Sequence, residues 1–335
     1  MHDGIQRQRL FQPQIKQEFL QTLTEETQKP YLRVLQLAAD SEYLYNTDLY
    51  DMNIDQIADV IRGINPLTLA SARSVIGYIK KYIEWAITEK GLAKTNIHPL
   101  SIIDPSWYGQ FVDFTKKLYF SEEEIFALEE DLLNGQDAVI LRLLFEGVYG
   151  DGQNELLNLR MRDLSLDDNR IRLYDDAKGE RTIEVSDRCV QLIREAYKQT
   201  KYFNRNGTVE NARRSTSMLV DAGYIIKTAK TRGKNVSRAA KHVIYRRLSV
   251  ISEVFEIPYL TTKNIWKSGQ IKFAYDLYMR DGELGSRQFY EIADRFNLTK
   301  IKNKLGGSEH YNISLMKDYI TSRNLKELYN IDIEI

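Results

Sequence analysis

The chain has 335 residues, 43% of them hydrophobic, so each of two domains has enough apolar side chains to bury a core. Its single cysteine, Cys189, excludes an internal disulfide framework, and no run of about 18 apolar residues is present that would cross a bilayer or direct secretion. We therefore expect a cytoplasmic protein that does not contact the membrane. Its 47 basic and 47 acidic residues cancel, so a charged binding surface must arise from their uneven distribution along the chain.

The first third of the chain has the apolar periodicity of helices. The predicted helices cover residues 14–22, 29–42, 54–62 and a longer segment that opens near Pro66 and ends at Gly91. In the long helix, apolar side chains recur at steps of three and four, which places them on one face. These side chains are Leu69, Ala72, Ile76, Ile79, Ile83 and Ala86.

A polar stretch over residues 94–104 is typical of a linker, because Pro99 lies inside it and Pro105 follows it. We therefore place the domain boundary there. The sequence predicts a first domain over residues 1–105 and a second over residues 106–335.

The second domain is predicted to combine helices with one antiparallel hairpin. Ser121 and Glu124 have the spacing of a capping box, and an apolar stripe follows from Ile125 to Leu132. The segment RIRLYDDAKGERTIEV, residues 170–185, alternates apolar and polar residues on both sides of a glycine-containing turn, as a β-hairpin does. Helical periodicity dominates after it. The predicted fold class is mainly α with a small antiparallel β-sheet.

Basic residues are concentrated in one segment of the second domain that has no acidic residue. They are Lys227, Lys230, Arg232, Lys234, Arg238, Lys241, Arg246 and Arg247. Charge runs of this kind are usually solvated faces or disordered loops. Here apolar and aromatic residues bracket and interrupt the charges, which favours an ordered surface that binds DNA. Residues 121–131, SEEEIFALEED, are correspondingly acidic and bring the average charge back to neutral.

Three segments, in the right order, resemble the tyrosine recombinases, or phage integrases. Residues 66–99, PLTLASARSVIGYIKKYIEWAITEKGLAKTNIHP, resemble the last helix of their core-binding domain and its run into the linker. YFSEEEIFALEEDLL resembles the opening helix of their catalytic domain, and ELLNLRMRDLSLDDNRIRLYDDAKGERTIEVSD resembles its first catalytic motif through the hairpin. The resemblance implies a helical, SAM-like core-binding domain over residues 1–105, a catalytic-like domain over residues 106–335, and double-stranded DNA as the partner.

In this family a tyrosine attacks a DNA phosphate while negative charge grows on the phosphorane oxygens, so preorganised cations are essential. The resemblance implies two arginines, a hairpin lysine and assisting histidines. The first arginine precedes the glutamate of its motif by three residues. Here GVYGDGQNELL keeps Glu155 but puts Gly152 at the arginine position, and glycine cannot clamp a phosphate.

The later motifs also depart from the family pattern. TTKNIWKSG puts Lys263 in place of a histidine and Trp266 in place of the second arginine. A register shift by one residue would bring Lys267 to the arginine position, but a lysine lacks the bidentate fork of a guanidinium. In LGGSEH, Gly307 takes the position of the late histidine, with His310 nearby.

The position expected for the nucleophile falls on Met316, flanked by Tyr311 and Tyr319. Tyr319 is the candidate nucleophile if the protein is a working enzyme. Lys178, in the hairpin turn DAKGER, occupies its family position cleanly. Without an attacking tyrosine, Lys178 would contact phosphate or be a solvated charge at the hairpin tip. We therefore predict a catalytically inactive homologue.

Predicted DNA contacts come from both domains. The start of the long helix offers Ser71, Arg73 and Ser74, which are two small donors and one guanidinium that reach a phosphate or a guanine edge. An ordinary exposed helix face would have the same composition. In the second domain, Lys178, Lys263 and Lys267 join the basic segment of residues 227–247.

The sequence indicates no metal and no cofactor. The histidines, at positions 2, 98, 242 and 310, are scattered without metal-ligand spacing. Gly147, Gly150 and Gly152 lack the pattern of a nucleotide-binding loop, and we expect them to form the turn at the position of the lost arginine.

These features favour a sequence-specific DNA-binding protein, a transcriptional repressor that maintains lysogeny, and not an enzyme. The chain resembles the integrase-like master repressors of SPβ-type Bacillus prophages, which have this fold without its catalysis. One alternative is a divergent, active recombinase in which Tyr319 or Tyr311 works with Lys178, Lys263, Lys267 and His310. Another is a module whose basic segment binds an acidic protein. The operator, the oligomeric state and any regulatory protein or peptide partner stay open.

Overall fold

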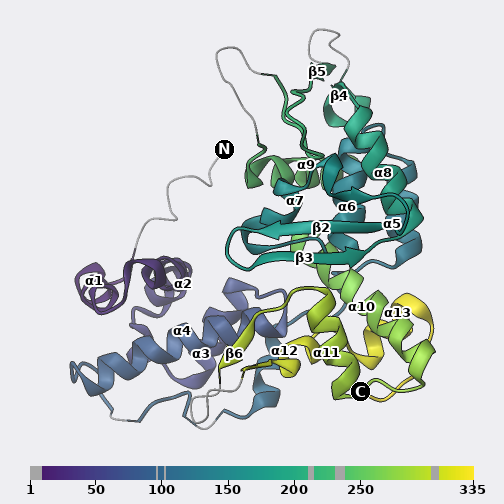
Figure 1. The fold of residues 1–335 in the computed structure, drawn as a ribbon. Coiled ribbons are helices and arrows are strands. Elements are labelled where there is room, and N and C mark those ends of the chain that lie inside the picture. The colour runs from purple at the N-terminus through teal and green to yellow at the C-terminus, as the bar shows by residue number, and fades with distance from the viewer. Residues whose placement is uncertain (1–9, 96, 102, 210–214, 231–237, 303–308) are drawn as a thin grey trace. The chain divides into compact units, whose positions relative to one another are not determined.

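The computed structural model describes residues 10–95, 97–101, 103–209, 215–230, 238–302 and 309–335. The chain forms two compact units, residues 1–116 and 117–335 (Figure 1). Trp107 and Phe111 pack against the hydrophobic core of the first unit, so this unit extends beyond the boundary predicted at residue 105. Within the described ranges, no helix is long and apolar enough to cross a membrane.

The first unit is built from helices. They are α1 (Pro13–Gln21), α2 (Glu25–Tyr45), the short 3-10 turn η2 (Leu49–Asp51), α3 (Ile54–Ile64), α4 (Leu69–Thr88) and the 3-10 segment η3 (Pro105–Phe111). Capping boxes at Asn53–Gln56 and Thr68–Ser71 determine where α3 and α4 begin. The predicted apolar face of α4 is buried at Ala72, Ile76, Ile79, Ile83 and Ala86, while Leu69 in its first turn is half-buried.

A cluster of buried charges joins α1, α2 and α4. The ammonium group of Lys16 donates to Glu42 at 2.6 Å and to Asp48 at 2.7 Å, and the hydroxyl of Tyr82 donates to Asp48 at 3.0 Å. One cation therefore faces two carboxylates in a site without exposed surface. Burial, opposed by Lys16 and reinforced by Asp48, raises the pKa of Glu42 to about 7.

The second unit combines helices with small antiparallel sheets. Its first half contains α5 (Glu122–Glu130), α6 (Gly135–Phe145), η4 (Asp151–Gln153), α7 (Asn154–Asn158), η5 (Met161–Asp163), β1 (Leu164–Ser165), β2 (Arg170–Asp175), β3 (Gly179–Glu184) and α8 (Asp187–Lys198). Its second half contains β4 (Lys201–Phe203), η6 (Asn204–Gly207), β5 (Thr216–Met218), α9 (Lys241–Val254), α10 (Thr262–Asp281), α11 (Ser286–Arg295), β6 (Lys300–Lys302), β7 (Glu309–Tyr311), α12 (Ile313–Lys317) and α13 (Ser322–Tyr329).

The predicted hairpin is confirmed as β2 and β3, which run side by side in Figure 1 and are joined by β1 at the edge of the sheet. In its register, Ile171 pairs with Ile183 and Leu173 pairs with Arg181. Ile171 and Leu173 are buried, so Arg181 lies on the inner face of the sheet. The mainly α fold with a small antiparallel sheet is the predicted class.

Helix α10 is held close to α6 by a glycine. A Cβ added at Gly269 would lie 1.7 Å from the carbonyl oxygen of Phe145, so the two backbones touch and no larger residue fits between them. This contact sets the position of α10, the helix that carries Lys263, Trp266 and Lys267.

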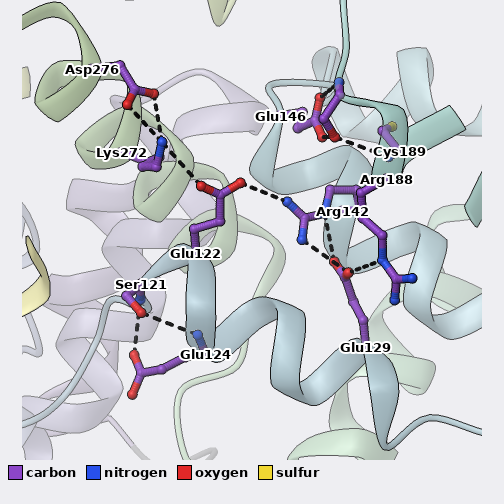
Figure 2. Close-up of polar contacts among 11 residues, drawn as sticks. Ser121, Glu122, Glu124, Glu129, Arg142, Glu146, Arg188, Cys189, Lys272 and Asp276 are labelled. Atoms are coloured by element: carbon purple, nitrogen blue, oxygen red, sulfur yellow. Dashed lines mark hydrogen bonds and ion pairs between the residues drawn. The ribbon is translucent and has the colours of Figure 1, made fainter. Parts of the chain in front are cut away.

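Two carboxylates of α5, Glu122 and Glu129, form ion pairs within the second unit, while Glu123 and Glu124 are exposed. Arg142 of α6, whose side chain is 2% exposed, contacts both carboxylate oxygens of Glu129 at 2.8 and 3.1 Å. Arg188 of α8 reaches the same carboxylate at 3.1 Å. Glu122 lies between Arg142 and Lys272 of α10, at 3.2 Å from each (Figure 2). The network therefore ties α5, α6, α8 and α10 together.

The raised pKa of Glu42 predicts a pH-dependent stability. Folding shifts this pKa upward from 4.5, so the folded chain holds a proton that the unfolded chain releases, and stability falls as pH rises from about 4.5 to 7. The full effect is about 3 kcal/mol in the free energy of unfolding. In urea unfolding of the full chain, the free energy of unfolding of Glu42→Gln should rise relative to that of the wild type between pH 5 and 7.5. Glu18→Gln, at a half-exposed surface pair, is the matched control; equal pH profiles for the wild type and Glu42→Gln would contradict the assignment.

Candidate functional site

The turn before α7 contains Gly152, at the position where the family resemblance implies the first arginine. Gly150 has φ 72° there, and an added Cβ would lie 2.6 Å from the backbone nitrogen of Glu155 and 2.7 Å from Asp175. Only glycine fits at this point. Gly152 also has a positive φ, 57°, but the space around it is open. The predicted glycine turn is thus present, and Gly152 brings no charged group to it.

The buried carboxylate of Glu155 is bound by an arginine from the hairpin. Nε of Arg181 donates to it at 2.6 Å and Nη2 at 2.7 Å, which forms a bidentate ion pair. The same guanidinium donates to the carbonyl oxygens of Gly147, at 2.9 Å, and Arg295, at 2.6 Å. Glu155 also accepts from the backbone of Tyr149 at 3.1 Å. Arg181 therefore joins β3, the glycine turn and the end of α11.

Lys178 lies at the same place. Its ammonium group donates to the backbone oxygen of Asn297 at 2.5 Å, and the side-chain amide of Asn297 donates to Glu155 at 3.0 Å. Burial lowers the pKa of Lys178, while the carboxylates around it oppose this shift. The structure therefore brings together Glu155 and Lys178, which the sequence singled out, with Arg181 and Asn297, which it did not.

Trp266, at the position where the family resemblance implies the second arginine, packs among aromatic rings. Its ring centroid lies 4.9 Å from that of Tyr149 and 6.1 Å from that of Phe296. An indole can fill apolar space but carries no positive charge. The geometry therefore offers packing at the position where the family resemblance implies a phosphate clamp.

Lys267 and Tyr319 face each other. The ammonium group of Lys267 lies 4.0 Å from the centre of the Tyr319 ring, and burial together with the cation of Lys263 lowers the pKa of Lys267 to about 8. The hydroxyl of Tyr319 is buried and donates to Gln270 at 2.6 Å. Burial raises the pKa of this phenol above its usual range, so it holds its proton more firmly than a free tyrosine.

Of the remaining candidates of these motifs, Lys263 lies one helical turn before Lys267 in α10, and Tyr311 and His310 lie in β7. Lys263 is exposed on the first turn of α10. The hydroxyl of Tyr311 donates to Asp294 at 2.5 Å, and His310 is half-buried in β7. Gly307 lies outside the described residues. Within the described part of the chain, no three histidine, cysteine or acidic side chains gather to hold a metal ion.

Two members of the basic segment are structural, which corrects their predicted role in DNA contact. Lys227 is 3% exposed, and its ammonium group donates to the carbonyl oxygens of Tyr197, at 2.5 Å, and Gln199, at 3.2 Å, at the end of α8. Arg247 is 6% exposed and donates to Lys227 O at 2.7 Å and to Gln136 Oε1 at 3.1 Å. Both side chains are used inside the unit and cannot reach DNA in this structure.

The other basic residues of the segment remain at the surface where the structure describes them. Lys230, Lys241 and Arg246 are exposed. Arg238 is partly exposed, forms a short hydrogen bond with Asn158 and lies 3.6 Å from Asp176. Arg232 and Lys234 lie outside the described residues.

In the first unit, the start of α4 presents only part of the predicted set. Ser71 is used in the capping box, since its hydroxyl donates to Thr68 O at 2.8 Å and accepts from Thr68 N at 2.9 Å. Ser74 is exposed, with its hydroxyl donating to Ala70 O at 2.9 Å. Arg73 is exposed on the polar face of the helix.

The chain is similar in fold to solved integrases. Relatives include the Tn1549 transposon integrase in complex with transposon right end DNA, with 11% identity, 91% of this chain and 93% of that chain covered, and a TM-score of 0.50. Another is a lambda integrase dimer bound to a COC' core site, with 12% identity, 88% and 80% coverage, and a TM-score of 0.49. The fold is that of a tyrosine recombinase, with a core-binding domain followed by a catalytic-like domain.

The family is more specific than the fold. The family models "MrpR, N-terminal core-binding domain" and "MrpR, C-terminal catalytic domain" match residues 10–89 and 119–330. The chain is 35% identical over 326 residues to the SPbeta prophage-derived uncharacterized protein YopR of Bacillus subtilis (strain 168), covering 96% of this chain and 97% of that protein. The chain belongs to the MrpR family, and the predicted kinship with SPβ-type prophage proteins is confirmed.

Arg246 and Arg247 are neighbours in α9 and give a matched test of the structural role of Arg247. Arg247→Ala leaves the carboxylate of Asp137, 3.6 Å from the guanidinium, buried without its cation. We expect a loss of about 3–5 kcal/mol in the free energy of unfolding. Arg246→Ala, one residue away and exposed, should change it by less than about 0.5 kcal/mol. Urea unfolding measures both; equal losses would show that Arg247 has no special structural role.

Proposed function

We propose that this protein binds double-stranded DNA at specific sites as a prophage transcriptional repressor that maintains lysogeny, and that it does not cut DNA. The proposal rests on one observation. The two positions at which the fold would hold phosphate-clamping arginines carry Gly152, which has no side chain, and Trp266, whose ring packs at a tilt against that of Tyr149. The recombinase fold that would bind DNA is kept, while the two arginines that would contact the phosphate are absent from these positions.

The DNA-binding part of the proposal is supported by the surface and by the relatives. Lys230, Lys241 and Arg246 are exposed cations of the second unit, and Arg73 is an exposed guanidinium of the first. Cations of this kind bind the phosphate backbone, and an arginine on a helix also reads guanine in the major groove. The Tn1549 and lambda integrase relatives are described in complex with DNA. We propose Arg73 for the specificity and the second-unit cations for the affinity.

The proposed lack of catalysis is supported by the hydroxyl of Tyr319, which is buried and hydrogen-bonded to Gln270. A nucleophilic phenol must lose its proton, and no arginine in the described part of the chain forms a hydrogen bond to this one. Its burial favours the protonated form. Arg181, the guanidinium that lies next to Lys178, is already committed to Glu155.

An active recombinase is the second candidate, and one contact favours it. The ammonium group of Lys267 lies 4.0 Å from the centre of the Tyr319 ring, and its pKa is lowered to about 8, so a tyrosine and a lysine with a lowered pKa lie together. The missing arginines weigh against it, because loss of one preorganised donor for the transition state commonly reduces the rate by about 10²–10³.

A nicked suicide substrate separates the two candidates. Purified protein incubated with duplexes that carry a nick near bound sites should form no covalent protein–DNA band on denaturing gels. The matched control is Tyr319→Phe, which should give the same empty lane. A covalent band in the wild type that disappears in Tyr319→Phe would establish the recombinase and remove the inactive repressor from consideration.

Charge removal tests the proposed surface. The double variant Lys241→Ala, Arg246→Ala should weaken binding to random and specific duplexes alike, because phosphate contacts do not depend on sequence. Each lost contact should make the plot of log K against log salt shallower by about 0.9. Arg323→Ala, which removes a half-exposed guanidinium from α13, is the control and should leave the slope unchanged. Equal slopes for all three proteins would place this surface away from DNA.

A further inference from the structure

A groove of about 250 Å³ lies on the outer face of the β1–β2–β3 sheet, away from Glu155 and Arg181. Along β2 and β3, alternate residues point outward, so Arg172 and Glu180 face the groove while Leu173 and Arg181 face inward. The other walls come from α7, the η5 turn and the backbone around Tyr224. The predicted DNA-contacting residues are not part of this groove.

The charges in the groove do not cancel. It is lined by the guanidinium groups of Arg160, Arg162 and Arg172 and by the carboxylates of Asp163 and Glu180. Asp163 is already occupied, since it accepts from Arg172 at 3.3 Å and from the backbone of Arg160 at 3.0 Å. Among the described residues, no carboxylate lies within ion-pair distance of Arg160 or Arg162. In the groove, Arg160 and Arg162 therefore share only one carboxylate that is not already bonded, that of Glu180.

Arg160 is held in place by a neutral partner. Its Nη2 donates to the hydroxyl of Tyr224 at 2.5 Å, and its guanidinium carbon lies 3.9 Å from the centre of the Tyr224 ring. The two backbones form an antiparallel bridge, which fixes this contact. A guanidinium has five N–H donors, so one bond to a hydroxyl leaves most of them for a ligand. The cation is thus oriented without being neutralised.

We propose that this groove binds a phosphate group. Arginine forks match phosphate oxygens in pairs, and a cation oriented before binding loses little further freedom on binding. Asn158 on the rim of the groove forms a short hydrogen bond with Arg238 of the basic segment, so the groove continues the cationic surface. The phosphate comes from the DNA backbone, an assignment that rests on the proposed function, or from a free phosphate compound. Both sources present the same chemistry to Arg160 and Arg162.

Two assays on the full chain separate these sources. The test variant is Arg160→Ala with Arg162→Ala, and the control is Arg323→Ala; circular dichroism and melting temperature verify that each is folded. The first assay follows the affinity for a random duplex as potassium chloride is varied. The second follows the melting temperature in pyrophosphate against chloride at equal ionic strength. Tyr224→Phe keeps the ring but removes the hydroxyl that orients Arg160.

If the phosphate comes from the DNA backbone, the test variant should lose roughly tenfold in duplex affinity at low salt. Its plot of log K against log salt should be shallower by about 0.9 for each lost contact, and Tyr224→Phe should lose less affinity than the test variant. The free-phosphate source predicts that pyrophosphate raises the melting temperature of the wild type and the control but not of the test variant, with duplex binding unaltered. If the wild type binds no duplex, the proposed function fails while the pyrophosphate assay still tests the groove. A test variant that behaves like Arg323→Ala in both assays overturns the proposal.

Discussion

The buried carboxylate of Glu155 is the constraint on which the second unit depends. It has no exposed surface, so it must be neutralised, and the residue that does so is Arg181 on the inner face of the hairpin. The same guanidinium satisfies the carbonyl groups of Gly147 and Arg295. Removing the guanidinium of Arg181 would leave the carboxylate of Glu155 buried without its cation and both carbonyl oxygens without this hydrogen-bond donor. Hairpin, glycine turn and α11 are thereby held as one body around a single ion pair.

This ion pair also holds the glycine turn, which contains Gly152 at the position where the family resemblance implies a catalytic arginine. The ring of Trp266, at the position where the resemblance implies the second arginine, packs near the rings of Tyr149 and Phe296. The guanidinium of Arg181 is turned inward, and the ring of Trp266 contributes apolar surface. The described surface of the second unit still carries the exposed cations Lys230, Lys241 and Arg246.

Much of the fold was predictable from local pattern, because caps, helix faces and strand alternation depend on near neighbours. The capping box at Ser121 and the hairpin are confirmed on that basis. The same alternation places Arg181 beside the inward residues Ile171 and Leu173, a signal that a buried partner is needed. In α9, Arg247 falls in the stripe of Ile244, Leu248 and Ile251, which marks it as inward. Treating residues 227–247 as one run of charges conceals the inward direction of Arg247. The partner of Lys227 at the end of α8 follows from tertiary packing alone.

We propose that the chain occupies discrete duplex sites and leaves their strands intact. Genome-wide footprinting tests it most directly: purified protein is mixed with fragmented prophage and host DNA, and the protected fragments are sequenced together with their ends. A site-specific binder that does not cut DNA should give a small set of strongly protected sites that share one sequence motif, with no new strand ends inside them. Uniform protection along the DNA, or breaks that recur at a fixed position within the protected sites, would contradict it.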